Sequence, residues 1–190
     1  MIRPSVALLA LSLLLPTSLQ GQATACWVRG DPAGAATRSS PLDSATAELG
    51  GGSLKICYGS PSTRGRTMVG EVESWGEPWR LGANEATALH VDVPVAVAGV
   101  RLAPGSYSLY AIPTPSTWTL VVNRAWQRWG IPISADVRAQ DVGEAALTPE
   151  RLGEPVETLR FFFQPGSEGA IELVMEWESN RLRIPVRPGA

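Results

Sequence analysis

The chain has 190 residues, of which 44% are hydrophobic and 18% charged, and its formal net charge is −2. This balance is typical of one folded domain and excludes a disordered chain, in which hydrophobic residues are few and net charge is high. A slightly acidic chain offers no basic face for phosphate contacts, so we expect no nucleic-acid partner.

The N-terminus predicts an export signal over residues 1–25. Arg3 precedes an apolar run from Val6 to Leu15, and small residues follow at Ala23 and Ala25, which is the pattern of a cleaved secretory signal peptide. The run is about half of the ~20 residues that a membrane-spanning helix needs. We therefore expect no transmembrane span and an exported product, either periplasmic or secreted.

Cys26 and Cys57 are the two cysteines of the chain. An even pair in an exported protein predicts a disulfide bridge, and closing this loop of about thirty residues is worth roughly 3.5 kcal/mol in the chain-entropy model. The alternative is a lipid anchor on Cys26 after cleavage behind Ala25. Ala23 at the third position before that cysteine, and the long spacer after the apolar run, favour the disulfide.

Residues 26–42 predict a flexible leader, because Gly, Ala, Ser, Thr and Pro dominate and no apolar period is present. Residues 43–188 then form the expected domain. Polar and apolar residues alternate there in short segments between turn residues, which predicts about nine strands. These strands are drawn from ten segments: 45–49, 53–58, 87–93, 95–98, 100–102, 106–112, 118–123, 156–163, 170–177 and 181–186.

The pattern as a whole predicts an all-β fold, a single antiparallel β-sandwich with one long irregular loop and little helix. That loop spans residues 59–86, where no period is present and where glycine, arginine and tryptophan collect. Residues 124–155 are expected to be a second irregular stretch with one helical turn near residues 134–140. Loops as long as the first are often functional.

Several short runs resemble the bacterial domain-of-unknown-function family 2911 over about residues 40 to 187, and the most specific is Trp-Arg-Leu-Gly-Ala-Asn-Glu at residues 79–85. Others are Ile-Cys-Tyr-Gly at 56–59, Pro-Gly-Ser-Tyr-Ser-Leu at 104–109, Trp-Gly at 129–130 and Glu-Trp at 176–177. The resemblance implies an exported, β-rich bacterial envelope domain and names no substrate. Ser60 stands where family members commonly have an arginine.

The long loop and its exit supply the candidate ligand-binding residues. An arginine guanidinium can form two parallel hydrogen bonds to a carboxylate or phosphate, and an asparagine side chain both donates and accepts hydrogen bonds. The face of a tryptophan ring can stack on a sugar ring or contact a cation. The candidates are Tyr58, Arg64, Arg66, Trp75, Trp79, Arg80, Asn84, Glu85 and Thr87. A structural role explains the same residues: Arg80 would pair with Glu85, Asn84 would turn the chain, and the tryptophans would cap the core.

Three functions remain open. The first is a non-enzymatic β-sandwich that binds a small polar ligand, a glycan or a partner protein through residues 58–87. The second is a hydrolase that uses Glu85 with Arg80, and the third is a purely structural envelope domain. His90 is the single histidine, so a Ser-His-Asp triad would have to use it, and no Gly-x-Ser-x-Gly motif is present. One histidine and two cysteines expected to be bridged leave too few ligands for zinc, so we expect no metal and no cofactor.

Overall fold

The structure is a computed structural model, and it describes residues 24–189. All of the expected export signal except Thr24 and Ala25 lies outside this range, so the signal stays a prediction. Within the described range no helix is long and apolar enough to cross a membrane.

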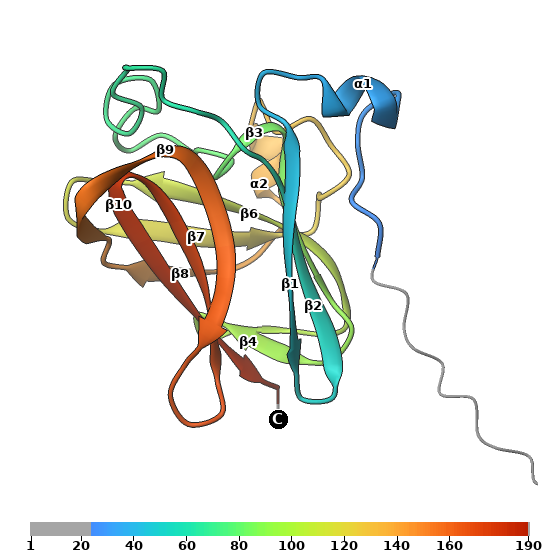
Figure 1. Cartoon of the computed structure of the whole chain (residues 1–190). Coiled ribbons are helices and arrows are strands. Elements are labelled where there is room, and N and C mark those ends of the chain that lie inside the picture. The colour runs from blue at the N-terminus through green and yellow to red at the C-terminus, as the bar shows by residue number, and fades with distance from the viewer. Residues whose placement is uncertain (1–23, 190) are drawn as a thin grey trace, which may run out of the picture.

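Strands dominate the described chain, and two short helices accompany them (Figure 1). In chain order the elements are α1 (Pro32–Ala36), β1 (Leu42–Leu49), β2 (Gly52–Gly59), β3 (Ala83–Val91), β4 (Val95–Val97), β5 (Val100–Leu102), β6 (Gly105–Pro113), β7 (Trp118–Asn123), α2 (Ala135–Arg138), β8 (Asp141–Leu147), β9 (Glu150–Pro165) and β10 (Ile171–Pro188).

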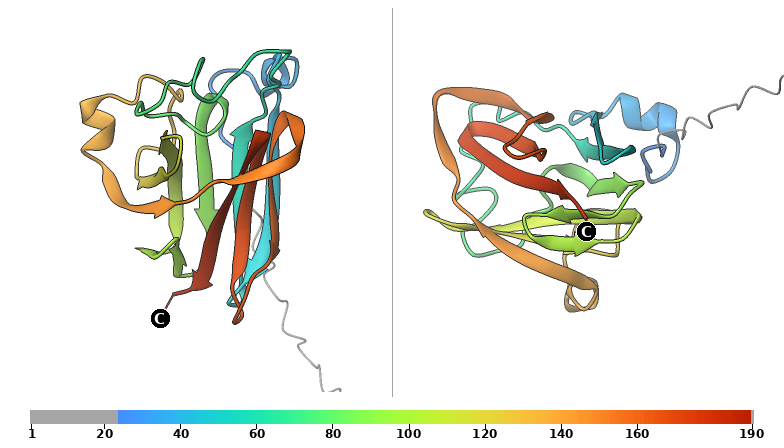
Figure 2. Two further views of the ribbon diagram at one scale, coloured as in Figure 1. Left: turned by 90° about the vertical axis from the view of Figure 1, so that its left-hand side faces the viewer. Right: turned by 90° about the horizontal axis from the view of Figure 1, so that it is seen from below.

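The strands form two sheets that face each other (Figure 2). One sheet has six strands in the order β1-β2-β3-β6-β7-β8, and the other has four in the order β5-β4-β10-β9. Neighbouring strands in both sheets pair in the antiparallel sense. The predicted all-β sandwich is therefore confirmed.

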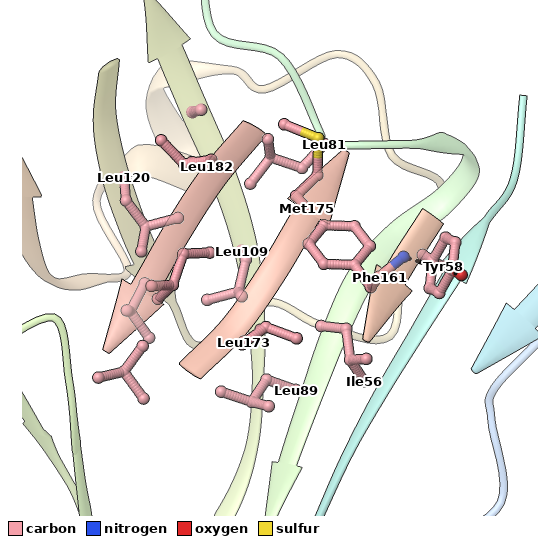
Figure 3. Packing of buried hydrophobic residues seen from close by; sticks show 14 of the residues in the cluster. Ile56, Tyr58, Leu81, Leu89, Leu109, Leu120, Phe161, Leu173, Met175 and Leu182 are labelled. Atoms are coloured by element: carbon pink, nitrogen blue, oxygen red, sulfur yellow. Dashed lines mark hydrogen bonds between the residues drawn. The ribbon is translucent and has the colours of Figure 1, made fainter. Parts of the chain in front are cut away.

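The element β10 turns back on itself near its middle. Glu178 has a φ of 52°, in the left-handed region that tight reversals use. Arg183 lies 2.8 Å from Glu172 although the two are eleven residues apart, and a straight strand would separate them by about 36 Å. The two halves of β10 thus lie side by side, as the separate ribbons that carry Leu173 and Leu182 show (Figure 3).

Apolar side chains of both sheets meet in one core (Figure 3). Leu89 and Leu109 come from the six-stranded sheet, and Leu173 and Met175 face them from β10, each with at most 1% of its surface exposed. Alternate residues of a strand share a face, so the period of two in the sequence is what assembles this core.

The expectation for residues 124–155 is wrong in part. The helical turn is present as α2, but β8 pairs along β7 and β9 already begins at Glu150. Gly143 and Pro149 concealed these strands in the sequence. A Cβ at Gly143 would come within 3.0 Å of Val100, so this glycine permits close packing between strands and does not end one.

The irregular loop is also shorter than expected, because β3 begins at Ala83 and not near residue 87. A Cβ at Gly59 would overlap the backbone carbonyl of Ala83, so only glycine lets β2 and β3 approach at this level. Asn84 has a φ of 63°, as the structural interpretation expected. The loop proper is residues 60–82, and it crosses one end of the sandwich next to β9 (Figure 1).

Candidate ligand-binding groove

The predicted site residues occupy four different places, although the sequence suggested one. Arg66 and Trp75 line a surface groove. Arg64, Asn84 and Glu85 contact the N-terminal segment. Tyr58, Trp79 and Thr87 are buried among the strands, and Arg80 is half-buried next to residue 130.

The groove has a volume of about 590 Å³ and lies between the irregular loop and parts of β9 and β10. Its floor and walls combine cationic, acidic, hydroxyl and apolar groups. The lining residues are Thr63, Arg66, Thr67, Val69, Trp75, Arg151, Pro155, Val156, Glu157, Glu178, Ser179 and Asn180.

Two carboxylates fasten the loop to the strands and so form the walls of the groove. Glu157 of β9 accepts hydrogen bonds from the Thr63 hydroxyl and from the Arg64 backbone N–H, the latter at 2.8 Å. These hydrogen bonds, first that of Thr63, lower the pKa of the Glu157 carboxyl. Glu178 of β10 accepts from the backbone N–H groups of Met68 and Val69 at 2.7 and 3.0 Å. All four carboxylate oxygens are therefore engaged by the loop.

Trp75 is the aromatic side of the groove, and 39% of its surface is exposed. Its ring packs against Gly70, where an added Cβ would lie 2.6 Å from ring atom Cε2. Gly70 also has a φ of 103°, which side chains rarely adopt. Glycine at this position thus lets the loop support the indole while leaving much of it open to solvent.

Arg66 and Arg151 are the cations of the groove, and both are exposed. Arg66 donates from Nε to the Thr63 carbonyl at 3.0 Å, and Arg151 donates from Nη1 to Oδ1 of Asn180 at 3.2 Å. Each guanidinium has five N–H donors, so most of them remain available to a bound molecule. The groove therefore offers hydrogen-bond donors next to an aromatic surface.

Three of the predicted site residues stabilise the fold. The Tyr58 hydroxyl donates to Asp43 at 2.9 Å and accepts from the Phe161 N–H at 3.0 Å, which ties β2 to β9. Trp79 stacks on Trp177 with ring centroids 5.5 Å apart in the core. Thr87 is fully buried and donates to the carbonyl of Leu81 at 2.9 Å.

Arg80 does not pair with Glu85, contrary to the structural interpretation of the sequence. Its Nε donates to the Gly82 carbonyl at 3.1 Å, and no carboxylate in residues 24–189 comes within 4.0 Å of it. Burial lowers the pKa of the Arg80 guanidinium, and the negative charges of Glu73 and Glu85 act in the opposite sense.

Glu85 is paired with the N-terminal segment, which we call the strap and define as residues 24–41. Both of its carboxylate oxygens accept from Arg38, each at 2.8 Å, and Oε1 also accepts from the Arg29 backbone N–H at 2.8 Å. Only 6% of the Glu85 side chain is exposed. The hydrolase hypothesis needs a carboxylate that reaches substrate, and Glu85 is outside the groove lining.

The confirmed disulfide between Cys26 and Cys57 attaches the start of the strap to β2. Asn84 donates from Nδ2 to the Ser40 carbonyl, and Arg64 donates from Nη2 to the Ser39 carbonyl, both at 2.8 Å. The segment expected to be a flexible leader thus has a covalent bond and several hydrogen bonds to the domain.

His90 is buried on β3 and is not part of the groove. Its Nδ1 lies 2.7 Å from the Ser106 hydroxyl, and its ring meets that of Trp126 edge to face. Burial lowers the pKa of His90, and the positive charge of Lys55 acts in the same direction. In the part of the chain that the structure describes, no three His, Cys, Asp or Glu side chains are grouped to hold a metal ion. The expected absence of a metal stays a prediction.

Sequence reasoning did not find the half of the groove that β9 and β10 supply. Arg151, Val156 and Asn180 lie about 70 to 100 positions after the end of the loop that they face. No local motif marks them, because the groove arises only from long-range contact between β9, β10 and the loop. Trp129 next to Arg38 was also missed, although it belongs to one of the quoted family runs.

Comparison with known proteins gives the family and no activity. The model of a family described as "Protein of unknown function (DUF2911)" matches residues 40–186. No curated protein and no solved structure matches the chain. The match covers well over half of the 190 residues, including the whole sandwich core and all of the groove lining, and it begins within the last residues of the strap. The chain belongs to the DUF2911 family.

Proposed function

We propose that the protein is a non-enzymatic binding protein that holds a small polar ligand, a sugar unit of a glycan, in the groove beside Trp75. The observation that carries this proposal is the groove itself, about 590 Å³ in volume and bounded by an exposed tryptophan and two arginines. Pockets of this size hold small molecules.

The lining has the chemistry that a sugar requires. The apolar face of a sugar ring stacks on an indole, and its hydroxyl oxygens accept hydrogen bonds from charged donors. Trp75 provides the stacking surface. Arg66 of the irregular loop and Arg151 of β9 provide the charged donors. The two carboxylates of the groove each accept two hydrogen bonds from the loop, which makes them supports of the site.

The test is a titration of the purified mature protein against a panel of bacterial and plant oligosaccharides by calorimetry. Trp75→Ala should weaken binding of any sugar that binds by at least tenfold, because it removes the stacking surface. Val72→Ala is the matched control, since Val72 is 51% exposed on the same loop and is absent from the groove lining. Equal affinities of the two variants, or no binding across the panel, would argue against the proposal.

We further propose that the protein is exported to the bacterial periplasm or beyond, without a lipid anchor. The disulfide supports this, because such bonds persist in oxidising compartments. A thioether lipid would need the same Cys26 sulfur that the disulfide uses. Intact mass of the purified protein separates the cases: loss of residues 1–25 with two hydrogens fewer than the reduced mass supports export and the disulfide, whereas an added diacylglyceryl mass contradicts it.

A further inference from the structure

The strap occupies a surface of the domain in the manner of a bound peptide. Four of its carbonyls accept hydrogen bonds from side chains: Ser39 from Arg64, Ser40 from Asn84, Arg29 from Arg38 at 3.1 Å, and Gly34 from Thr37 at 3.0 Å. The first two donors belong to the domain. They contact the backbone and not the side chains of Ser39 and Ser40, so these two contacts do not depend on which residues occupy those positions.

The guanidinium of Arg38 forms an ion pair with the domain at this surface. It lies against both oxygens of Glu85, and its Cζ is 5.6 Å from the centroid of the Trp129 ring. A carboxylate and an aromatic face together form a site that suits a planar cation, and arginine satisfies both better than lysine does. The burial of Glu85 strengthens its electrostatic attraction for the cation.

The Glu85 and Trp129 pair is built by the domain and does not need the strap. The two residues form an isolated β-bridge. Hydrogen bonds on either side fix this contact: the Ala86 N–H donates to the Arg128 carbonyl at 3.1 Å, and the Gly130 N–H donates to the Asn84 carbonyl at 2.7 Å. The domain by itself therefore fixes the backbone positions of both residues of the site.

We propose that Glu85 and Trp129 form a binding site for the arginine side chain of a polypeptide, and that Arg38 of the strap occupies this site in cis. Because the strap is joined to the domain at Cys26 and again at β1, the effective concentration of Arg38 at the site is high. The site accepts an arginine from a second polypeptide when the Cys26–Cys57 bond is absent and the strap has left. This surface is separate from the Trp75 groove, so the inference does not depend on the proposed function.

The probe is a fluorescein-labelled synthetic peptide with the sequence of residues 28–41, and its binding is measured by fluorescence anisotropy. Three forms of the full mature chain are compared: the unmodified protein, Cys26→Ser with Cys57→Ser, and that pair combined with Arg38→Gln. The unmodified protein should not bind the peptide. The triple variant should bind it at least tenfold more tightly than the double variant, because its own strap no longer competes.

A control peptide with Arg38→Gln should bind the triple variant at least tenfold more weakly than the parent peptide. Equal binding of the two peptides, or no binding of either to a folded triple variant, overturns the proposal.

A second measurement covers the case in which the triple variant does not fold. Arg38→Gln alone keeps the disulfide, and millimolar ethylguanidinium should then raise its Tm by several degrees relative to ethylammonium at equal ionic strength. Unmodified protein and Glu85→Gln with Arg38→Gln should show no such difference. If ethylguanidinium and ethylammonium shift the Tm of Arg38→Gln equally, Glu85 and Trp129 do not form a guanidinium site.

Discussion

Tyr58→Phe tests whether this tyrosine, a sequence-based candidate for ligand binding, is instead a link between the two sheets. The substitution keeps the ring and its edge contact with Phe161, whose centroid is 4.9 Å away, and removes only the hydroxyl. Phe161 is 4% exposed, so its backbone N–H is left without a partner (Figure 3). An unsatisfied buried donor costs about 1–3 kcal/mol.

The second hydrogen bond of the hydroxyl adds little, because Asp43 is exposed and water can replace the tyrosine there. The free energy of unfolding should therefore fall by about 2 kcal/mol, and the Tm by about 4–8 °C for a domain of this size. Urea denaturation measures the change, and an unaltered m value would show that the denatured state is unaffected.

Asp43→Asn is the matched control, since it retains an acceptor for the hydroxyl and should cost less than about 1 kcal/mol. Affinity for any ligand of the groove should be unchanged in Tyr58→Phe, because Tyr58 is absent from the groove lining. A stability change below about 0.5 kcal/mol combined with a loss of ligand binding would refute the assignment and restore Tyr58 as a binding residue.

Two further predictions concern a buried charge and a close contact. Burial raises the pKa of Glu176, but hydrogen bonds from Arg160 and Arg181 outweigh it and hold that pKa below the ordinary value of 4.5. The stabilising contribution of the Glu176 carboxylate is thus complete above about pH 4.5 and is lost as the pH falls through the lower pKa of the folded state. The difference in free energy of unfolding between the unmodified protein and Glu176→Gln should therefore narrow in urea titrations from pH 6 to pH 2. A difference that stays constant over this range would contradict the prediction. Gly130→Ala should destabilise by about 1–3 kcal/mol, because its Cβ would lie 2.9 Å from the Asn84 carbonyl oxygen. Gly153→Ala, where nothing lies within 4 Å, should be neutral within about 0.5 kcal/mol, and equal thermal shifts for both alanine variants would show that Gly130 is not a packing constraint.

The strands that the sequence predicts best are those whose burial alternates locally. In β2, Leu54, Ile56 and Tyr58 face the core while Lys55 faces away, so a period of two is enough to identify the strand. β8 was not predicted, because a glycine such as Gly143 usually indicates the end of a strand. Only its contact with Val100 of another strand shows why a glycine is required there.

The contacts of the candidate site residues are even harder to predict from the local sequence. Residue types suggested that Arg80 would pair with Glu85, five positions along, yet the partner of Glu85 is Arg38, 47 residues away. Charged side chains pair with whichever opposite charge the fold brings near, and distance along the chain carries little of that information between strands. The same holds for Trp75, whose facing residues come from β9 and β10.

Composition and periodicity alone predicted the all-β fold and favoured a disulfide between the two cysteines over a lipid anchor, and the structure has both the two sheets and the disulfide. These predictions were possible because a period of two and an even cysteine pair are local or countable properties of a chain. The tertiary structure decided which of the candidate residues line the groove, which are buried among the strands, and which contact the strap. These roles depend on contacts between residues far apart in sequence, and such contacts exist only once the two sheets have packed.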